Sequence, residues 1–504
     1  MGASEGAGGS QGAEQALQAL AAVFGAGGGQ PTNEVAARLT QHLGAGADRM
    51  EIVTEPVPAF EHVNLQAALD AYLSGPGRTH ELLGVKGGES SGIFGLPQAP
   101  QLEALLSGGD SPAAARFGSV EYMNRPCGPD QTRPCVNKGL LLVDDNGTRL
   151  AVWVHEEKIG NMAGTTVMQV VSDDIEASRA FLAGIGSLMR DLNIYRGNVL
   201  SVSADQTGGL SLSFAERFKA ERDAVILPPG VLETLEDQTI GIGELRDRLL
   251  AAGRHLKRGL LLYGPPGTGK THTIRYLTSR LEDYTVFFLT GSMMAALRTV
   301  GDLLPRVAPA LVVLDDVDLI AEDRERGGQS PRRFLFDLLD LMDGLHDDLD
   351  VVFILTTNRV EAIESAISAR PGRVDHAVEI PVPDRDALGR LLDLYGEGID
   401  LKLADREAVI ARLEGVTASF VRELLRRATL LAARQAETSE TSETSDPSPL
   451  TLTVSDEHVH AALDRLLDPH SPLTAALLGR HQASGVATAT SSDSGPGAEW
   501  CALA

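Results

Sequence analysis

The chain of 504 residues contains, at Gly264–Thr271, the sequence GPPGTGKT, which decides its fold. This stretch satisfies the pattern G-x-x-x-x-G-K-[ST], in which the backbone N–H groups of a glycine-rich loop surround phosphate groups. A strand candidate at 259–263 precedes the loop, and a helix-compatible segment at 272–281 follows it. Phosphate binding requires a strand, a loop and a helix in this order. The alternative, a Gly/Pro turn without function, does not explain the flanking strand and helix.

Each residue type in the loop suits a bound triphosphate. Glycines remove side chains, so that consecutive N–H groups can face the phosphates, and the following helix directs its positive end at them. We expect Lys270 to reach the β- and γ-phosphates and Thr271 to place its hydroxyl on Mg²⁺. ATP and Mg²⁺ are therefore the expected cofactors. The expected ATP contacts are Gly264, Pro265, Pro266, Gly267, Thr268, Gly269, Lys270 and Thr271.

Apolar runs of strand length recur through the region around this loop. Helix-length segments separate the runs, and this alternation is typical of a parallel sheet in an α/β fold. The runs are Gly259–Tyr263, Val286–Thr290, Leu311–Leu314, Val351–Thr356 and His376–Ile380. We therefore predict the parallel α/β sheet of a P-loop NTPase over residues 226–383.

One of these runs ends in two carboxylates, Asp315 and Asp316. Ligands of parallel α/β sheets bind at the carboxyl ends of the strands. We expect Asp315 to help hold Mg²⁺ and Asp316 to orient or deprotonate the attacking water. A solvated acidic turn is the alternative, because apolar strands followed by acids are common.

With these two motifs placed, the stretch from about Ile240 to Leu467 resembles the AAA family of ATPases. The resemblance implies that Asn358 contacts the γ-phosphate or the water. It implies that Arg370 and Arg373, in the segment ARPGRVD, are arginine fingers donated to the ATP of a neighbouring subunit. Two surface arginines in a Pro-Gly turn are the alternative. The resemblance also implies that Ile240 and Gly241 cover the adenine, although a helix-entry turn would have the same sequence.

The chain departs from the family at three places. Family members usually carry Glu where this chain has Asp316, and the loss of one methylene withdraws the carboxylate by about 1.5 Å. No aromatic-hydrophobic-Gly triplet occurs between Thr290 and Leu311, so Met293 and Met294 are the candidate pore residues. Ser419 stands where other branches place a sensor-2 arginine. The acidic strand end also resembles that of the mitochondrial Bcs-type AAA chaperones.

Composition shifts divide the rest of the chain. The pair Pro228-Pro229 marks a boundary before the sheet region, and the repeat-like stretch from Glu437 to Glu443 indicates an insertion. We expect a flexible Gly/Ala-rich segment over 1–49, a separate α+β domain over 50–225, the ATPase sheet over 226–383, a helical lid over 384–468 with a disordered insertion at 436–449, and a flexible tail over 469–504.

The charge balance limits the function. A formal net charge of −25 disfavours tight binding to nucleic acid or to an anionic membrane, because phosphate groups attract clustered cations. No stretch approaches the roughly 18 apolar residues that cross a bilayer. The three cysteines, Cys127, Cys135 and Cys501, provide neither a disulfide framework nor a closely spaced metal-ligand pair, which suits a reducing cytoplasm.

The leading hypothesis is an ATP-hydrolysing machine. By the resemblance it forms a ring of six subunits and remodels a protein partner held by the N-terminal domain. A second hypothesis, favoured by Asp316 and by the missing pore triplet, is an ATP-gated binding scaffold or switch that hydrolyses ATP slowly. A third, a DNA-acting loader, is disfavoured by the acidic charge.

Overall fold

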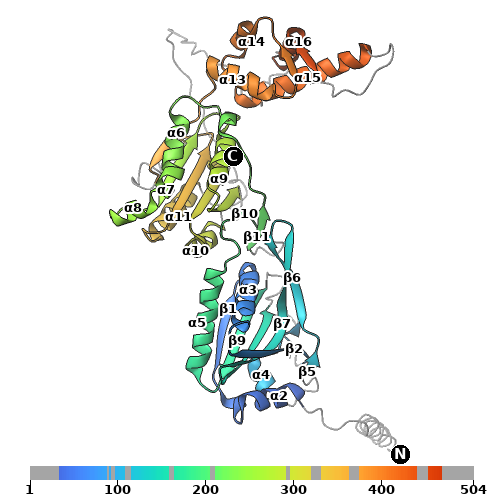
Figure 1. Cartoon of the computed structure of the whole chain (residues 1–504), viewed down its shortest axis with the longest axis vertical. Coiled ribbons are helices and arrows are strands. Elements are labelled where there is room, and N and C mark those ends of the chain that lie inside the picture. Colours follow the sequence, from blue (N-terminus) through green and yellow to red (C-terminus); the bar gives the residue numbers. More distant parts are fainter. Residues whose placement is uncertain are drawn as a thin grey trace, which may run out of the picture. The chain divides into compact units, whose positions relative to one another are not determined.

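A computed structural model describes residues 33–87, 90–91, 97–107, 115–157, 164–204, 210–290, 296–318, 331–361, 374–439 and 452–467 (Figure 1). The chain forms two compact units. The first contains residues 1–220, 235–261 and 274–377, and the second contains 221–234, 262–273 and 378–504. Each unit is described by itself.

The N-terminal part of the first unit is an α+β structure around a seven-stranded sheet in the order β1-β9-β8-β7-β2-β5, with β6 paired to β7. Its strands are β1 (Ile52–Val57), β2 (Arg78–Lys86), β5 (Arg116–Gly118), β6 (Glu121–Gly128), β7 (Gln131–Asp145), β8 (Thr148–Glu157) and β9 (Thr165–Ser172), and its helices are α2 (Glu34–Leu43), α3 (His62–Leu73), α4 (Leu102–Ser107) and α5 (Ile175–Asp191). The short strands β3 (Ser90–Ser91) and β4 (Pro97–Gln98) pair with each other.

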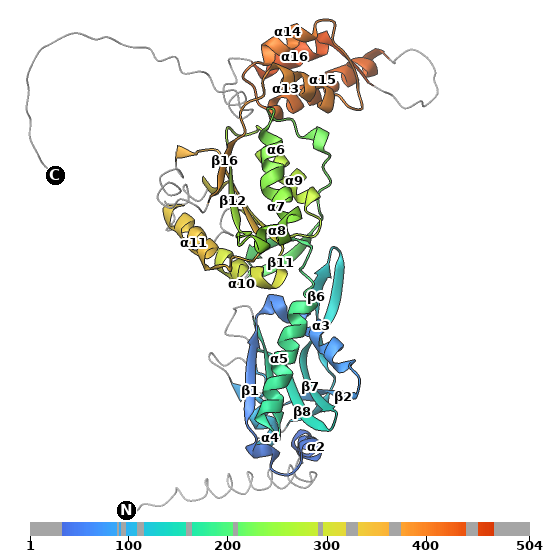
Figure 2. The ribbon, with the colours of Figure 1, turned by 60° about the vertical axis from the view of Figure 1, so that its left-hand side comes forward.

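Helices cover both faces of this sheet. Leu141 and Val143 of β7 pack with α3 and α5, whereas the alternate residues Leu140 and Leu142 pack with α2 and α4. Figure 2 shows α5 lying across the strands. Because successive side chains of a strand point to opposite faces, a strand that is buried on both faces has a continuous apolar sequence. This explains the uninterrupted run GLLLV in β7.

The ATPase sheet has seven strands in the order β11-β10-β13-β14-β15-β12-β16. The strands are β10 (Val199–Ala204), β11 (Leu210–Ala215), β12 (Arg258–Tyr263), β13 (Thr285–Thr290), β14 (Ala310–Asp315), β15 (Val351–Thr357) and β16 (His376–Glu379). All five predicted strands are present, and β13, β14 and β15 run parallel. The helices are α6 (Val231–Glu236), the π-helix η5 (Asp237–Gly241), α7 (Ile242–Glu244), α8 (Arg246–Ala251), α9 (Lys270–Arg280), α10 (Leu297–Val307) and α11 (Pro331–Gly344).

The expected domain boundary at residue 225 does not follow the sheets. Strand β10 pairs in parallel with β13, and β11 pairs antiparallel with β10. Two strands that the sequence places in the N-terminal domain therefore extend the ATPase sheet. Leu200 and Val202 of β10 belong to the same apolar core as α10 and α11, and this core also includes Val63 of α3 and Cys135 of β7.

In the second unit, helices occupy the region where the sequence predicts a lid. They are α13 (Arg385–Tyr395), α14 (Arg406–Leu413), α15 (Ala418–Ser439) and α16 (Asp456–Leu466), with β17 (Asp400–Lys402) paired to β18 (Thr453–Ser455). Their apolar faces share one core, centred on Leu392, Leu413, Phe420 and Leu463. Among the described residues, no helix combines the length and apolar character needed to cross a membrane.

Candidate functional site

The loop Gly264–Gly269 connects the end of β12 to the first residue of α9, Lys270. Gly264, Gly267 and Gly269 have φ angles of 146°, 80° and 112°, which other residue types rarely adopt. A Cβ atom on Gly264 would lie 2.2 Å from the carbonyl oxygen of Ile380, and one on Gly267 would lie 2.1 Å from Oγ of Ser419. Both backbone conformation and space therefore require glycine at these two positions.

The side chain of Lys270 lies against the loop. Its Nζ atom donates hydrogen bonds to the carbonyl oxygens of Gly264 at 2.8 Å and Pro265 at 2.9 Å, and the residue is 6% exposed. Thr268 also donates to the carbonyl of Pro265, at 3.0 Å. Thr271 is the second residue of α9 and is exposed. A buried ammonium group beside a glycine loop and a helix N-terminus forms an electrostatic environment suited to an anion.

Helix α15 begins beside the same loop. The backbone N–H of Ser419 donates to the carbonyl oxygen of Gly267 at 3.1 Å, and the Ser419 hydroxyl lies 3.0 Å from that of Thr417. The sequence indicated Ser419 only as the position at which other AAA branches carry a sensor-2 arginine. The structure shows that two hydroxyls stand at this position, in contact with the phosphate loop.

A small apolar cavity of about 10 Å³ adjoins Thr268 of the loop. It is lined by Ile226, Leu227, Pro228, Thr268, Pro381, Pro383, Asp384, Ala387, Leu391 and Ala418. Ile240 and Gly241, which the resemblance assigns to the adenine, are not among the lining residues and lie in η5 of the first unit.

In the first unit, the carboxyl ends of β14 and β15 bring Asp315, Asp316 and Asn358 together. Asn358 Nδ2 donates to Asp316 Oδ1 at 3.2 Å, and the backbone N–H of Asn358 donates to Asp318 Oδ1, also at 3.2 Å. Asp316 has a φ angle of 53°, a left-handed conformation that costs a non-glycine residue on the order of 1 kcal/mol. Parallel strand ends thus meet as the sequence predicts.

Thr356 holds these acids in place. Its hydroxyl donates to Asp315 Oδ1 at 2.6 Å and accepts the backbone N–H of Asp316 at 2.7 Å. Because one hydroxyl uses both its donor and its acceptor capacity, the position of the strand end is fixed. Sequence analysis missed Thr356 and Asp318, although the Thr-Thr-Asn end of β15 was a usable signal.

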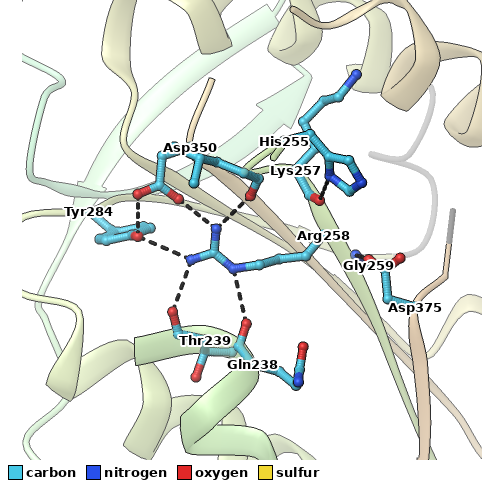
Figure 3. Close-up of polar contacts among 10 residues, drawn as sticks. Gln238, Thr239, His255, Lys257, Arg258, Gly259, Tyr284, Asp350 and Asp375 are labelled. Carbon is cyan, nitrogen blue, oxygen red and sulfur yellow. Dashed lines mark hydrogen bonds and ion pairs between the residues drawn. The ribbon is translucent and has the colours of Figure 1, made fainter. Parts of the chain in front are cut away.

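A buried ion pair lies at the start of β12. Arg258 and Asp350 are joined at 2.7 Å, and their side chains are each 3% exposed (Figure 3). The Arg258 guanidinium also donates to Tyr284 Oη and to the carbonyl oxygens of Gln238, Thr239 and Leu256, and Tyr284 Oη donates to Asp350 Oδ2 at 2.6 Å. Burial raises the pKa of Tyr284. This network joins η5 and Asp350, the residue before β15, to the start of β12, the strand that ends at the phosphate loop. The sequence did not predict it.

Arg370, Arg373, Met293, Met294 and Cys501 lie outside the described residues. The backbone N–H of Gly259 donates to Asp375 Oδ2 at 3.0 Å, so the last residue of the ARPGRVD segment is anchored to β12.

One histidine lies directly after Thr271, and two cysteines lie in the N-terminal sheet. His272 lies 3.1 Å from the carbonyl oxygen of Ala224. Cys127 and Cys135 are free thiols, and burial raises the pKa of Cys135 to about 11. Within the described ranges, no group of three or more His, Cys, Asp or Glu side chains is placed to bind a metal by itself.

Comparisons with known proteins agree with this geometry. The family model described as "ATPase family associated with various cellular activities (AAA)" matches residues 260–382. The chain is 32% identical over 252 residues to ATP-dependent zinc metalloprotease FtsH 2 of Sphaerobacter thermophilus, a match that covers 47% of this chain and 36% of that protein. It is 32% identical over 188 residues to the cell division cycle protein 48 homolog of Archaeoglobus fulgidus, covering 35% and 26%.

A third relative is 26S protease regulatory subunit 6A of Caenorhabditis elegans, 30% identical over 170 residues, covering 31% of this chain and 39% of that protein. The chain therefore spans less than half the length of each of these three relatives. The family model matches the region that contains the loop Gly264–Thr271 and the acidic strand end at Asp315 and Asp316. Residues 260–382 are therefore an AAA domain.

Proposed function

We propose that the chain binds and hydrolyses ATP, assembles into a ring, and couples ATP turnover to the remodelling of a protein partner held by its N-terminal domain. The observation that carries the proposal is the hydrogen bond from Asn358 Nδ2 to Asp316 Oδ1 at 3.2 Å, within an AAA domain. An amide beside a carboxylate can hold a water molecule for attack on a phosphate. The ring of six rests on the family resemblance, and the cytoplasmic location rests on the small number of cysteines.

Each site residue has a role in the proposed reaction. Lys270 neutralises charge on the β- and γ-phosphates, and Thr271 and Asp315 offer Mg²⁺ a hydroxyl and a carboxylate oxygen. Held by these two residues, Mg²⁺ would supply positive charge that stabilises the phosphates during transfer. Asp315 fits this role because the hydrogen bond from Thr356 holds its carboxylate in one orientation. Asp316 orients the water, and Asn358 fixes the Asp316 carboxylate.

For the base of the nucleotide, we place the adenine beside Ile226–Pro228 in preference to Ile240 and Gly241. The support is the apolar lining that this segment forms with Thr268 of the phosphate loop, Ala387 and Ala418. A flat apolar ring suits such a lining. Ile240 and Gly241 remain the residues that the resemblance assigns to the adenine.

The second candidate is a slowly hydrolysing, ATP-gated scaffold. It is favoured by the short Asp316 side chain, whose Oδ1 already accepts a hydrogen bond from Asn358 and whose N–H is bonded to Thr356. Asp316→Glu and Asp316→Asn decide between the two candidates in a steady-state ATPase assay. A hydrolase limited by reach gains turnover in Asp316→Glu and falls to background in Asp316→Asn. Equal turnover in the wild type and in Asp316→Asn supports the scaffold.

The assembly is tested with two inactive variants. Lys270→Ala loses ATP binding because the phosphates lose their cation, whereas Arg370→Ala keeps binding but loses turnover because the neighbouring site lacks its guanidinium. Mixed oligomers of the two variants are expected to regain part of the activity, since each supplies what the other lacks. Light scattering with size-exclusion chromatography checks that both variants assemble. If mixing restores nothing while both assemble, Arg370 does not act across a subunit interface.

A further inference from the structure

One arginine outside the nucleotide site binds the far end of the helix that begins at Lys270. Arg217 lies in the segment after β11, and its guanidinium donates four hydrogen bonds, all to backbone carbonyl oxygens. Nη1 donates to Thr278 at 2.8 Å and to Leu281 at 2.9 Å, while Nη2 donates to Tyr284 at 2.8 Å and to Gly197 at 3.0 Å.

The position of these acceptors gives the contact its physical meaning. Thr278 lies in the last turn of α9 (Lys270–Arg280), and Leu281 follows the helix end. The last carbonyl oxygens of a helix have no partner within the helix and carry the negative end of its dipole. A half-buried guanidinium satisfies them and is attracted to that end. Arg217 therefore caps the same helix whose other end bears the phosphate loop.

The fourth acceptor connects this cap to the N-terminal domain. Gly197 lies in the turn 193–198 between α5 and β10, and its N–H donates to Thr285 Oγ1 of β13 at 3.0 Å. On its other side the turn is bound to α3, because Asn64 Oδ1 accepts the N–H of Ile194 at 3.0 Å. Tyr195 Oη donates to the carbonyl oxygen of Phe60. The turn is thus held by both the ATPase sheet and the N-terminal domain.

Neighbouring contacts hold the segment around Arg217 along α9. The Arg275 guanidinium lies 4.4 Å from the centre of the Phe218 ring, and the Ser279 hydroxyl donates to the carbonyl oxygen of Ala220 at 3.2 Å. Lys219, in the same segment, is exposed. The segment 217–220, which follows β11, is therefore held along α9.

We propose that Arg217 is a positioning residue that couples the nucleotide-binding helix α9 to the N-terminal domain through the turn 193–198. The inference rests on the proposed function, because it assumes that ATP contacts the N-terminal end of α9. A change in the direction of α9 on ATP binding moves the carbonyl oxygens at its other end. The rigid, multidentate guanidinium transfers this displacement to Gly197. A lysine ammonium, with three donors on a flexible stem, reproduces only part of the contact.

The experiment uses the full chain with Arg217→Ala, Arg217→Lys and the matched control Lys219→Ala. Hydrogen exchange of peptides covering 193–204 and 59–73 is measured with and without a non-hydrolysable ATP analogue, and ATPase kcat and KM are measured in parallel. In the wild type and in Lys219→Ala, the analogue is expected to slow exchange in both peptides. Arg217→Ala is expected to bind the analogue with a Kd changed by no more than about threefold, but without the slower exchange in the two peptides. Its kcat is expected to fall by about five- to tenfold at nearly constant KM. Arg217→Lys recovers part of both.

The outcomes separate this inference from the proposed function. If Arg217→Ala keeps the full exchange response, the coupling role is wrong, whatever the ATPase activity. If the wild type binds the analogue but does not hydrolyse ATP, hydrolysis is wrong and the exchange comparison still decides the role of Arg217. If the wild type binds no analogue, both fail. Should Arg217→Ala not fold, Arg217→Lys carries the same comparison, and an unchanged response in that variant overturns the inference.

Discussion

Two buried carboxylates of the first unit pair with an arginine in different ways. Asp350 is 2% exposed and contacts Arg258 at 2.7 Å, with the Tyr284 hydroxyl donating a second bond at 2.6 Å. Glu61 is 1% exposed, but its contact with Arg306 is 3.4 Å long, and 46% of the Arg306 side chain is exposed. Its other donor is Asn64 Nδ2, at 2.7 Å. Burial raises the pKa of Glu61 despite these two partners.

The difference separates a rigid core from a junction. The Arg258 network lies inside the fold that surrounds β12, where the guanidinium donates to buried or half-buried acceptors. The Glu61–Arg306 pair joins the N-terminal end of α3 to the last turn of α10, and solvent weakens it. Because Asp350 has close partners, it holds the elements around it in one arrangement. Because Glu61 has a distant, partly exposed cation, its protonation state and the position of α3 relative to α10 can change more easily.

The largest effect is expected for Arg258→Ala. The change leaves the Asp350 carboxylate buried without its cation, and breaking a buried pair in this way costs about 3–5 kcal/mol of folding free energy. Denaturant unfolding followed by circular dichroism measures the loss. The double variant Arg258→Met with Asp350→Leu removes both charges and is expected to be more stable than Arg258→Ala alone. A loss below about 1 kcal/mol in Arg258→Ala would contradict the rigid-core view.

A smaller effect is expected for Tyr284→Phe. The phenol ring stays in place, but Asp350 loses a hydrogen-bond donor and Arg258 loses an acceptor. Loss of one hydrogen bond to a buried charged group costs about 1.5–3 kcal/mol. The same denaturation measurement applies. Tyr263→Phe, in the half-buried last residue of β12, provides the matched control. Equal losses in the two variants would show that the Tyr284 hydroxyl is not part of the network.

The smallest effect is a change in pH dependence caused by Glu61→Gln. Because the pKa of Glu61 is raised above 4.5 in the folded chain, the folded state binds its proton more tightly than the unfolded state does. The stability that this proton contributes is present below pH 4.5 and is lost as pH rises through the folded pKa. Wild type should therefore lose stability relative to Glu61→Gln over that range. Fluorescence of Trp153, which is buried in the N-terminal sheet, follows the unfolding.

Arg306→Ala sharpens the same measurement. Removing the cation raises the Glu61 pKa further, so the pH-dependent loss should extend to higher pH than in wild type. If the stability of wild type and of Glu61→Gln depends on pH in the same way, burial does not raise the pKa of Glu61. The proposed difference between Glu61 and Asp350 is then wrong.

The sequence predicted the elements whose residues carry their own local signal. Four of the five predicted strands, β12 to β15, were recognisable because they are buried on both faces, which makes their sequences almost continuously apolar. The edge strand β16 is only half-buried, and its signal was its place after the other four. The loop at Gly264–Thr271 was recognisable because its backbone tolerates only glycine at fixed positions. Asp316 and Asn358 were each predicted as site residues at a strand end, and the parallel pairing of β14 with β15 brings Asn358 Nδ2 to 3.2 Å from Asp316 Oδ1.

The missed features depend on long-range pairing. The alternating sequence VLSVSA of β10 suits any half-buried sheet edge, and only the folded chain shows that its partner is β13. Arg258 and Asp350 are 92 positions apart, and neither has a neighbouring residue that indicates the other. The sequence does not identify the partners of Arg217, because its hydrogen bonds go to backbone carbonyl oxygens, which every residue type carries.

The pairing of β10 with β13 has a practical consequence for dissecting the chain. A truncated protein that begins at residue 226 would lack both β10 and β11, and the edge of β13 would present unpaired N–H and C=O groups to solvent. Open strand edges of this kind recruit other chains and promote aggregation. An isolated ATPase fragment should therefore begin before Val199, and a soluble N-terminal fragment should end near Leu192.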